Sequence, residues 1–468
     1  MGGSLGLQFG IGLLAQLVLA AILTAHDFGL FALAVAVSHL FSSIANFGIR
    51  TLMSQRSPGE IVALRQPVQR VGMWAALICA VVLAAISPVA ADLLGEPELV
   101  TLLLVMALTF PLKPYVGIAT SLLQARLRFS RVAWALLAAT ASHYVVAIAL
   151  ARAGHGALSL VIGLQVNAVV AAVTLWFLSR GDKVAATGDA PSARQVVTLA
   201  RWPLAGEVGS EVMGKFDFLM LGLFVPTEVV GIYYFGYQLV VRLNELLGGV
   251  ARNVLYPALA QIRHDEGRQN TAVVRAAALM TLGGGAAAAL LIASFGSVEE
   301  ILWGGRWEAA VPTVMLLASA APGQAMQAAV EQLLKVRGRF RRWTVVIAVR
   351  VVGSALVALA VGAMLGGSAE ASTVAAAIAV FLVLEVVVEL AVVGRGLGVP
   401  LRRLGAATLG FWPVLVAAGW AIAALTDGFG GSPWWAAVVA GLLAGSAALA
   451  VLIVGRRLGA VERSILPR

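Results

Sequence analysis

Residues 71–91 read VGMWAALICAVVLAAISPVAA and contain no Asp, Glu, Lys or Arg. A helix crosses the hydrocarbon core of a bilayer with about 20 consecutive apolar residues, so this stretch predicts a transmembrane helix. It also holds the single cysteine of the chain, Cys79. One cysteine cannot form a disulfide within the chain, and no Cys/His cluster indicates a zinc site.

The whole chain shares this composition. Of its 468 residues, 60% are hydrophobic and only 12% are charged, about half the charged share of a soluble domain. This argues against a soluble enzyme, a disordered chain, a disulfide scaffold and a nucleic-acid-binding domain. The N-terminus is apolar almost at once but lacks a basic region and a small-residue cleavage site. We therefore interpret it as a retained first span and not as a signal peptide.

Charged or Pro/Gly-rich joints divide the sequence into about fourteen predicted transmembrane helices, so the expected fold is an all-α polytopic membrane protein. Small residues are frequent in these spans and allow helices in lipid to pack closely. The predicted spans are 5–24, 28–48, 71–91, 98–120, 132–151, 156–178, 202–224, 229–250, 271–294, 309–330, 343–365, 372–393, 405–425 and 434–454.

Lys and Arg lie mainly in alternate joints. With the N-terminus inside, 26 of the 33 Lys and Arg residues fall in inside joints or the C-terminal tail, and five fall within spans. The outside joints hold only Arg152 and Arg306. Because cytoplasmic loops are enriched in Lys and Arg, we expect both termini in the cytoplasm. The net charge of +10 then reflects topology and does not indicate nucleic acid as a partner.

The two halves of the chain echo one another. Residues 25–33 read AHDFGLFAL and residues 227–235 read TEVVGIYYF, so each runs from an acidic residue through Gly29 or Gly231 into an apolar helix. This repeat predicts two six-helix lobes related by a parallel pseudo-two-fold axis, with the substrate site between them. The expected parts are an N-lobe at 1–180 (helices 1–6), a cytoplasmic linker at 181–201, a C-lobe at 202–395 (helices 7–12), and helices 13–14 with a cytoplasmic tail at 396–468.

An ordered set of short motifs resembles the polysaccharide transporters of the MOP (multidrug/oligosaccharidyl-lipid/polysaccharide) superfamily. The resemblance extends over nearly the whole chain and implies a MATE-like fold and a flippase of the bacterial inner membrane. The motifs are HDFGLFAL at 26–33, NFGIR at 46–50, LLQARLRF at 122–129, the stretch from Asp217 through Gly222 and GIYY at 231–234 to VLYPALA at 254–260, WGGRW at 303–307, and KVRG at 335–338.

Ionisable residues within predicted spans mark the candidate substrate cavity, because a charge at that depth is costly. Glu207, Glu211 and Lys215 recur every four residues and share one face of helix 7. The resemblance implies that helices 1, 2, 7 and 8 surround a central cavity. The predicted cavity residues are Arg242, Lys215, Glu211, Glu207, Glu245, Asn244, Gln16, His39 and Asn46. The alternative is that Glu211–Lys215 and Arg242–Glu245 are structural pairs within a helix.

A second set of charges is predicted to gate or couple the transporter. Asp217 matches an acid that recurs in the family near the exit of helix 7, where a helix-end or gating contact is expected. Glu385 and Glu389 share a face of helix 12 and would repel one another, so we expect one to be protonated or paired, with Arg350 as the partner. The alternatives are a structural ion pair and a site that couples transport to Na⁺ or H⁺.

The resemblance implies a polyprenyl-diphosphate-linked oligosaccharide as cargo, moved by alternating access for polysaccharide export, alongside a polymerase and export machinery. We find no nucleophile–base pair or metal cluster, so an enzyme is not expected. One feature argues against a simple diphosphate-binding cavity. Acids outnumber bases in the predicted spans, whereas a diphosphate favours a cationic cavity. The alternatives are a cation-coupled, MATE-like multidrug exporter and a polytopic glycan ligase or polymerase.

Overall fold

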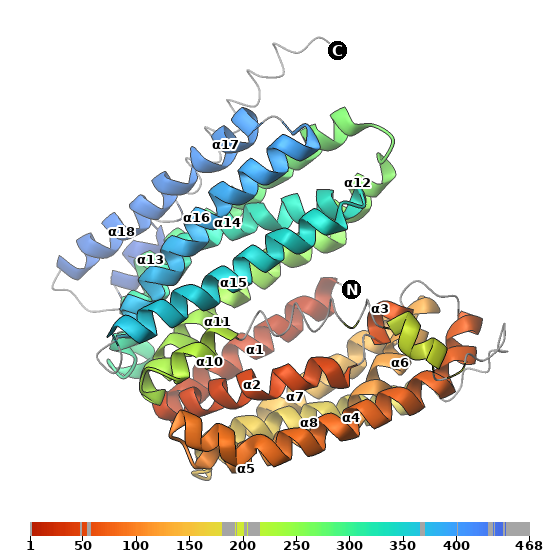
Figure 1. Ribbon diagram of the computed structural model, residues 1–468. Helices are drawn as coiled ribbons and strands as arrows, with labels where there is room; N and C mark the ends of the chain where they lie inside the picture. Colours follow the sequence, from red (N-terminus) through yellow and green to blue (C-terminus); the bar gives the residue numbers. More distant parts are fainter. Residues whose placement is uncertain are drawn as a thin grey trace. The chain divides into compact units, whose positions relative to one another are not determined.

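The computed structural model describes residues 2–46, 49–53, 58–179, 194–200, 216–365, 370–399 and 401–428, with a few further positions between 192 and 204 and between 434 and 445. Every regular element in these ranges is a helix, as Figure 1 shows. The predicted all-α class is thereby confirmed. The chain divides into two compact units, Met1–Gly231 and Ile232–Arg468.

The first unit is a bundle of antiparallel helices. Its helices are α1 (Gly2–Ile22), α2 (Ala25–Ala45), α3 (Ile49–Met53), α4 (Pro58–Leu94), α5 (Glu98–Ala107), α6 (Leu112–Ala125), α7 (Phe129–Arg152), α8 (Gly156–Ser179) and α10 (Phe216–Gly222). α7 packs along α8 and α1, and α2 packs against α4, α5, α8 and α10. The bounds of α2, α7 and α8 lie within three residues of the predicted spans.

α4 begins well before its predicted span at 71–91. Ile61, Leu64 and Val68 in this extension recur at helical spacing and are buried, which continues an apolar stripe beyond the hydrocarbon-length segment. The stripe packs in a hydrophobic cluster with residues of α3 and α6. Val196 and Ala200, which belong to the stretch predicted as linker, are fully buried in the same cluster. The extension therefore serves packing at one end of the bundle.

The predicted span at 98–120 is broken. α5 and α6 meet at an angle of 44° across residues 108–111, where Pro111 precedes α6. Proline disfavours the helical conformation of the residue before it and lacks an amide donor. The break places Lys113 and Pro114 in the first turn of α6.

The second unit is also helical. Its elements are α11 (Thr227–Val250, which begins in the first unit), the π-helix η1 (Ala251–Leu255), α12 (Tyr256–Gln261), α13 (Glu266–Trp303), the 3-10 helix η2 (Glu308–Ala310), α14 (Val311–Val336), α15 (Phe340–Leu365), α16 (Ala371–Leu397), α17 (Leu401–Leu409) and α18 (Trp412–Gly428). α13 packs along α14 and α18, and α16 packs on α14 and α15.

Small residues allow α13 and α18 to approach closely. A methyl group on Gly285 of α13 would lie 2.6 Å from a methyl carbon of Leu415, and one on Gly419 of α18 would lie 3.0 Å from Ala289 Cα. Trp412, at the start of α18, donates from its indole nitrogen to the carbonyl oxygen of Ser319 on α14 at 2.7 Å. These contacts hold α18 against α13 and α14 within the second unit. In lipid, close approach of backbones takes the place of the hydrophobic driving force.

Eight described helices are long and apolar enough to cross a membrane, or nine if the bent pair α5 and α6 forms one span. α1 and α18 contain shorter apolar segments, Gly6–Ile22 and Trp412–Thr426. Most of the predicted spans at 202–224 and 434–454 lies outside the described residues. The count of fourteen therefore stays a prediction.

The WGGRW motif forms a tight turn at the end of α13. Gly304 and Gly305 have φ angles of +63° and +86°, a region that side chains with a Cβ rarely adopt. Trp307 donates its backbone N–H to Glu299 Oε1 at 2.7 Å and is only 2% exposed. Its ring stacks on Phe235 of α11 with ring centres 4.2 Å apart. The motif thus fixes α11 against the end of α13.

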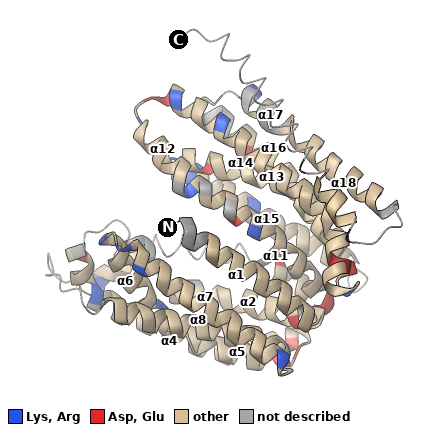
Figure 2. Cartoon of the chain, turned by 180° about the vertical axis from the view of Figure 1, so that it is seen from behind, with Lys and Arg blue, Asp and Glu red and all other residues tan. Residues whose placement is uncertain are grey.

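Charged residues gather at the two ends of α13. Figure 2 shows acidic residues where α13 ends and η2 begins, and basic residues at the other end, near α12. The acids are Glu299, Glu300 and Glu308, and the bases include Arg263, Arg268 and Arg337. The basic end also holds Asp265 and Glu266, and the acidic end also holds Arg306, so the separation of charge signs along α13 is partial.

Candidate functional site

α11 carries the predicted cavity residues that the structure describes in the second unit. Arg242 Nη1 lies 3.3 Å from Glu245 Oε2, and their side chains are 28% and 56% exposed. An exposed pair at this spacing stabilises a helix by only about 0.2–0.5 kcal/mol. Asn244 donates to Gln324 Oε1 of α14, so this amide joins two helices of one unit. Arg242 is thus partly buried, whereas its partner Glu245 is more than half exposed.

Of the predicted site residues of helix 7, the structure describes only Asp217. Glu207, Glu211 and Lys215 lie outside the described residues. Asp217 is in the first turn of α10 and is 8% exposed, and its Oδ1 accepts from the backbone N–H of Phe218 at 3.0 Å. A carboxylate in the first turn of a helix is stabilised by the positive end of the helix dipole. A gating role for Asp217 stays a prediction.

α1 and α2 carry the predicted polar residues of the first unit. Gln16 of α1 is buried, whereas His39 and Asn46 at the end of α2 are partly buried. Ser42 lies between the last two and shares their helix face, because positions i, i+3 and i+7 align. Lys113 of α6 donates to the hydroxyl of Ser42 and lies 4.6 Å from the centre of the Phe110 ring. Sequence reasoning missed Ser42, although its helical spacing from His39 and Asn46 could have revealed it.

A cluster of charged residues lies inside the second unit, and we name it the Arg350 cluster. Its members are Glu331 and Lys335 of α14, Arg350 of α15, and Glu385 and Glu389 of α16. Arg350 Nε lies 2.8 Å from Glu385 Oε1, Nη2 lies 3.6 Å from Glu389 Oε2, and Nη1 lies 3.4 Å from Glu331 Oε1. The sequence paired Arg350 with the two glutamates of α16 but missed Glu331. Gln327, Glu331 and Lys335 recur every four residues, and this spacing could have indicated the third carboxylate.

The Arg350 cluster contains more carboxylates than cations. Three glutamates face Arg350 and Lys335, so the sum is −1 if all five groups are ionised. The side chains of Glu385 and Glu389 are only 2% and 1% exposed. An uncompensated buried charge is unfavourable by several kcal/mol. One carboxylate of the Arg350 cluster therefore lacks a balancing cation within the cluster when all five groups are ionised.

Gly29 and Gly231, the two glycines that mark the repeat, meet at a close crossing of α2 and α11. A methyl group on Gly231 would overlap the carbonyl oxygen of Ala25 and lie 2.8 Å from Gly29 N. A methyl group on Gly29 would overlap the carbonyl oxygen of Thr227. Only glycine allows the two backbones to come this close.

Asp27 holds the start of α2 in place. It forms a capping box with Thr24, whose hydroxyl accepts from Asp27 N at 3.1 Å. Asp27 Oδ1 also accepts from the backbone N–H of Ala157 at 3.0 Å, which joins α2 to the start of α8. Sequence reasoning used Asp27 only as the acidic residue of the repeat and missed its capping role, although Thr-x-x-Asp before an apolar helix resembles a capping-box signal.

Comparisons with known proteins agree with this architecture. The profile of a family described as polysaccharide biosynthesis protein matches residues 18–312. The succinoglycan biosynthesis transport protein ExoT of Rhizobium meliloti (strain 1021) is 27% identical over 315 residues, which are 66% of this chain and 62% of that protein. The lipopolysaccharide biosynthesis protein WzxC of Escherichia coli (strain K12) is 24% identical over 314 residues, 66% of this chain and 63% of that protein. The matches thus cover less than two thirds of each relative.

Two solved structures share the fold at low sequence identity. The lipid II flippase MurJ in an inward closed conformation aligns with a TM-score of 0.74 and 13% identity, covering 97% of this chain and 98% of that one. An inward-facing multidrug resistance MATE family transporter of the MOP superfamily aligns with a TM-score of 0.59 and 14% identity, covering 85% of this chain and 95% of that one. The predicted MATE-like fold is confirmed. With the family profile matching more than half of the chain, the protein belongs to the polysaccharide biosynthesis protein family of membrane proteins.

Proposed function

We propose that this protein is a flippase that moves a polyprenyl-diphosphate-linked oligosaccharide across the bacterial inner membrane for polysaccharide export. The observation that carries the proposal is the family match over residues 18–312. The names of ExoT and WzxC, a transport protein and a lipopolysaccharide biosynthesis protein, support the same activity. Both termini are then cytoplasmic, and the partners include a polysaccharide polymerase and export machinery.

The proposed cargo has two parts with opposite solubility. A hydrophilic glycan cannot enter hydrocarbon without losing its hydrogen bonds to water, so it needs a polar passage through the protein. The polyprenyl tail can stay in lipid throughout the movement. Alternating access exposes the glycan first to one side of the membrane and then to the other, and no covalent bond changes. The proposed activity is therefore transport and not catalysis.

Arg242 is the described residue best suited to bind the diphosphate. Its guanidinium can donate two parallel hydrogen bonds to phosphate oxygens, and the carboxylate of its partner Glu245 is 56% exposed. A diphosphate could therefore displace Glu245 at little cost. Lys215, Glu207 and Glu211 of the same predicted cavity belong to the proposal on sequence grounds alone.

The Arg350 cluster is the proposed site of energy coupling. Its excess carboxylate can take up a proton or Na⁺ at one side of the membrane and release it at the other. One charge moved through the membrane potential supplies about 2.3 kcal/mol per 100 mV, enough to bias a transport cycle. The coupling cation proposed here is bound and released with each cycle and is not a resident cofactor.

The test is a deletion strain complemented with wild-type protein or with single variants. The deletion should accumulate lipid-linked repeat units on the cytoplasmic face, and wild-type protein should clear them. Arg242→Ala should leave protein abundance unchanged and reduce export at least tenfold, whereas Arg242→Lys should keep part of it. Arg252→Ala is the matched control, because Arg252 is an exposed arginine of the adjoining π-helix.

Three outcomes contradict the proposal. Absence of accumulated lipid-linked units in the deletion strain rules out the flippase. Proton- or sodium-driven efflux of small organic cations, lost in Asp217→Asn, would establish a multidrug exporter instead. New glycosidic bonds formed by purified protein from lipid-linked donors would establish a ligase or polymerase.

A further inference from the structure

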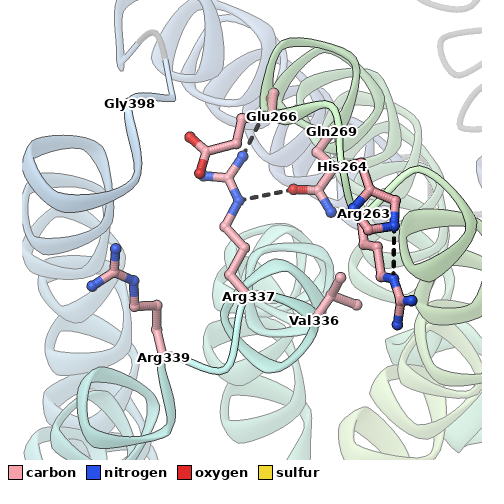
Figure 3. A pocket seen from close by; sticks show the side chains of 8 residues that line it. All are labelled: Arg263, His264, Glu266, Gln269, Val336, Arg337, Arg339 and Gly398. Carbon is pink, nitrogen blue, oxygen red and sulfur yellow. Dashed lines mark hydrogen bonds between the residues drawn. The ribbon is translucent and has the colours of Figure 1, made fainter.

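A pocket opens at one end of the second unit, where several helices begin or end. It has a volume of about 480 Å³ and is lined by Arg263, His264, Glu266, Gln269, Arg337 and Arg339, among others. These residues come from the turn between α12 and α13, from the first turn of α13, and from the turn between α14 and α15 (Figure 3). The pocket is separate from Arg242 and from the Arg350 cluster.

The lining of this pocket is cationic. Three guanidinium groups and one carboxylate give a sum of +2 with His264 neutral. Partial burial lowers the pKa of Arg337 below its ordinary value, Glu266 opposes this decrease, and the positive charge of Arg339 adds to it. The two arginines therefore repel one another across the pocket. An anion placed between them would relieve that repulsion.

Hydrogen bonds hold Arg337 in a defined position. Its Nε donates to Gln269 Oε1 at 2.9 Å, and Nη2 donates to Asn270 Oδ1 at 2.8 Å and to the carbonyl oxygen of Glu266 at 3.2 Å. Gln269 is 1% exposed, so this support is rigid. Asn270 also donates to the carbonyl oxygen of Gly398 at 3.0 Å, which joins the end of α16 to the pocket.

The other two arginines are more accessible. Arg263 and Arg339 are both exposed, and Arg263 Nε donates to His264 Nε2 at 3.1 Å. Figure 3 shows Arg339 on one side of Arg337 and Arg263 on the other. One fixed guanidinium between two adaptable ones can surround a tetrahedral anion and donate to several of its oxygens.

The pocket lies at the level where spans end. Candidate membrane spans begin at Glu266 and Arg341 and end at Val336, so Arg263, Arg337 and Arg339 lie within three residues of these limits. Basic pockets between helix ends at a membrane surface bind the phosphates of anionic lipid headgroups. We propose that this pocket binds a phosphate-bearing anion, with the headgroup of an anionic phospholipid as its source.

The test measures binding by purified full-length protein and needs no transport cargo, so its result is independent of the proposed flippase activity. The double variant Arg263→Gln/Arg339→Gln removes two guanidinium groups and keeps the Arg337 network. Arg268→Gln is the matched control, because Arg268 is an exposed arginine in the first turn of α13 that does not line the pocket. Circular dichroism and thermal unfolding check that all three proteins are folded.

Two ligands distinguish the sources of phosphate. Native mass spectrometry with phosphatidylglycerol against phosphatidylcholine should show selective adducts on wild-type protein and on Arg268→Gln, weakened at least tenfold in the double variant. Isothermal titration with inorganic diphosphate in neutral detergent tests the soluble source. Binding of diphosphate alone, lost in the double variant, keeps the anion site but assigns it to a soluble ligand. Equal binding of both ligands by the double variant and the control, or no binding of either by wild-type protein, overturns the proposal.

Discussion

Replacing Arg350 with methionine removes the cation that faces carboxylates from two neighbouring helices. Arg350 lies 2.8 Å from Glu385, 3.4 Å from Glu331 and 3.6 Å from Glu389. The two glutamates of α16 are almost completely buried, and removal of one partner from a buried ion pair costs about 3–5 kcal/mol. Methionine keeps much of the aliphatic volume, so the expected loss in the free energy of unfolding comes mainly from the stranded carboxylates.

A compensating variant separates charge from packing. Adding Glu385→Gln and Glu389→Gln to Arg350→Met removes both stranded carboxylates, while Glu331 keeps Lys335 at 3.5 Å. Because a buried ion pair can be replaced by uncharged groups with little net loss, the triple variant should recover most of the lost stability. The triple variant should be more stable than Arg350→Met only if water is excluded from the Arg350 cluster, as the small exposed fractions of Glu385 and Glu389 indicate.

The assay is thermal unfolding in detergent, followed by intrinsic tryptophan fluorescence at one heating rate. At about 2 °C per kcal/mol for a large domain, Arg350→Met should lower Tm by roughly 6–10 °C. Arg275→Met on α13 is the control, because Arg275 is exposed and such surface changes stay within about 0.5 kcal/mol. A Tm for Arg350→Met within 1 °C of the control, or a triple variant less stable than the single one, would refute the reasoning, because either result means that water already screens the cluster.

Two further predictions concern the helix contacts. Gly231→Ala should lower the yield of folded protein severalfold, because its methyl group would overlap the carbonyl oxygen of Ala25. Gly249→Ala on the same helix meets nothing within 4 Å and should be neutral or up to about 1 kcal/mol stabilising; size-exclusion chromatography of both variants checks this, and equal yields would contradict the close crossing. Glu299→Gln should lower the free energy of unfolding by about 1–3 kcal/mol, because a hydrogen bond from Trp307 N to a charged acceptor becomes one to a neutral acceptor. Tryptophan fluorescence should report the loosened turn, and an unchanged emission spectrum and Tm would count against it.

Hydrophobic length predicted most of the fold. The spans expected at 132–151 and 156–178 become α7 and α8 with shifts of at most three residues, because their ends coincide with charged or glycine-containing turns. α4 departs from its prediction because its first turns bury Ile61 and Leu64 against a neighbouring cluster instead of lipid. Hydropathy measures transfer into hydrocarbon and therefore misses helical turns stabilised by protein contacts outside it.

Contacts in the candidate sites could be predicted from the sequence only where both residues lie on the same helix. Arg242 and Glu245 are three residues apart, so their pairing follows from helical geometry alone. The contact from Lys113 to Ser42 joins α6 to α2, and the approach of Arg350 to Glu331 joins α15 to α14. Such contacts depend on how helices cross, and one sequence carries no direct signal for the crossing. The basic pocket was missed for a related reason, because its arginines had been assigned to two separate topogenic loops.

The repeat and the crossing of α2 with α11 have the same physical origin. Each half places a glycine four residues after the first residue of an apolar helix that follows a short turn, at Gly29 and Gly231. One glycine would remove a Cβ from only one side of the crossing, and the facing Cβ would still keep the backbones apart. The two glycines together allow Gly231 to approach both Ala25 and Gly29. The glycine that the two halves share is therefore also required for the close crossing of α2 and α11. Replacing either Gly29 or Gly231 with a larger residue should disturb the starts of both helices.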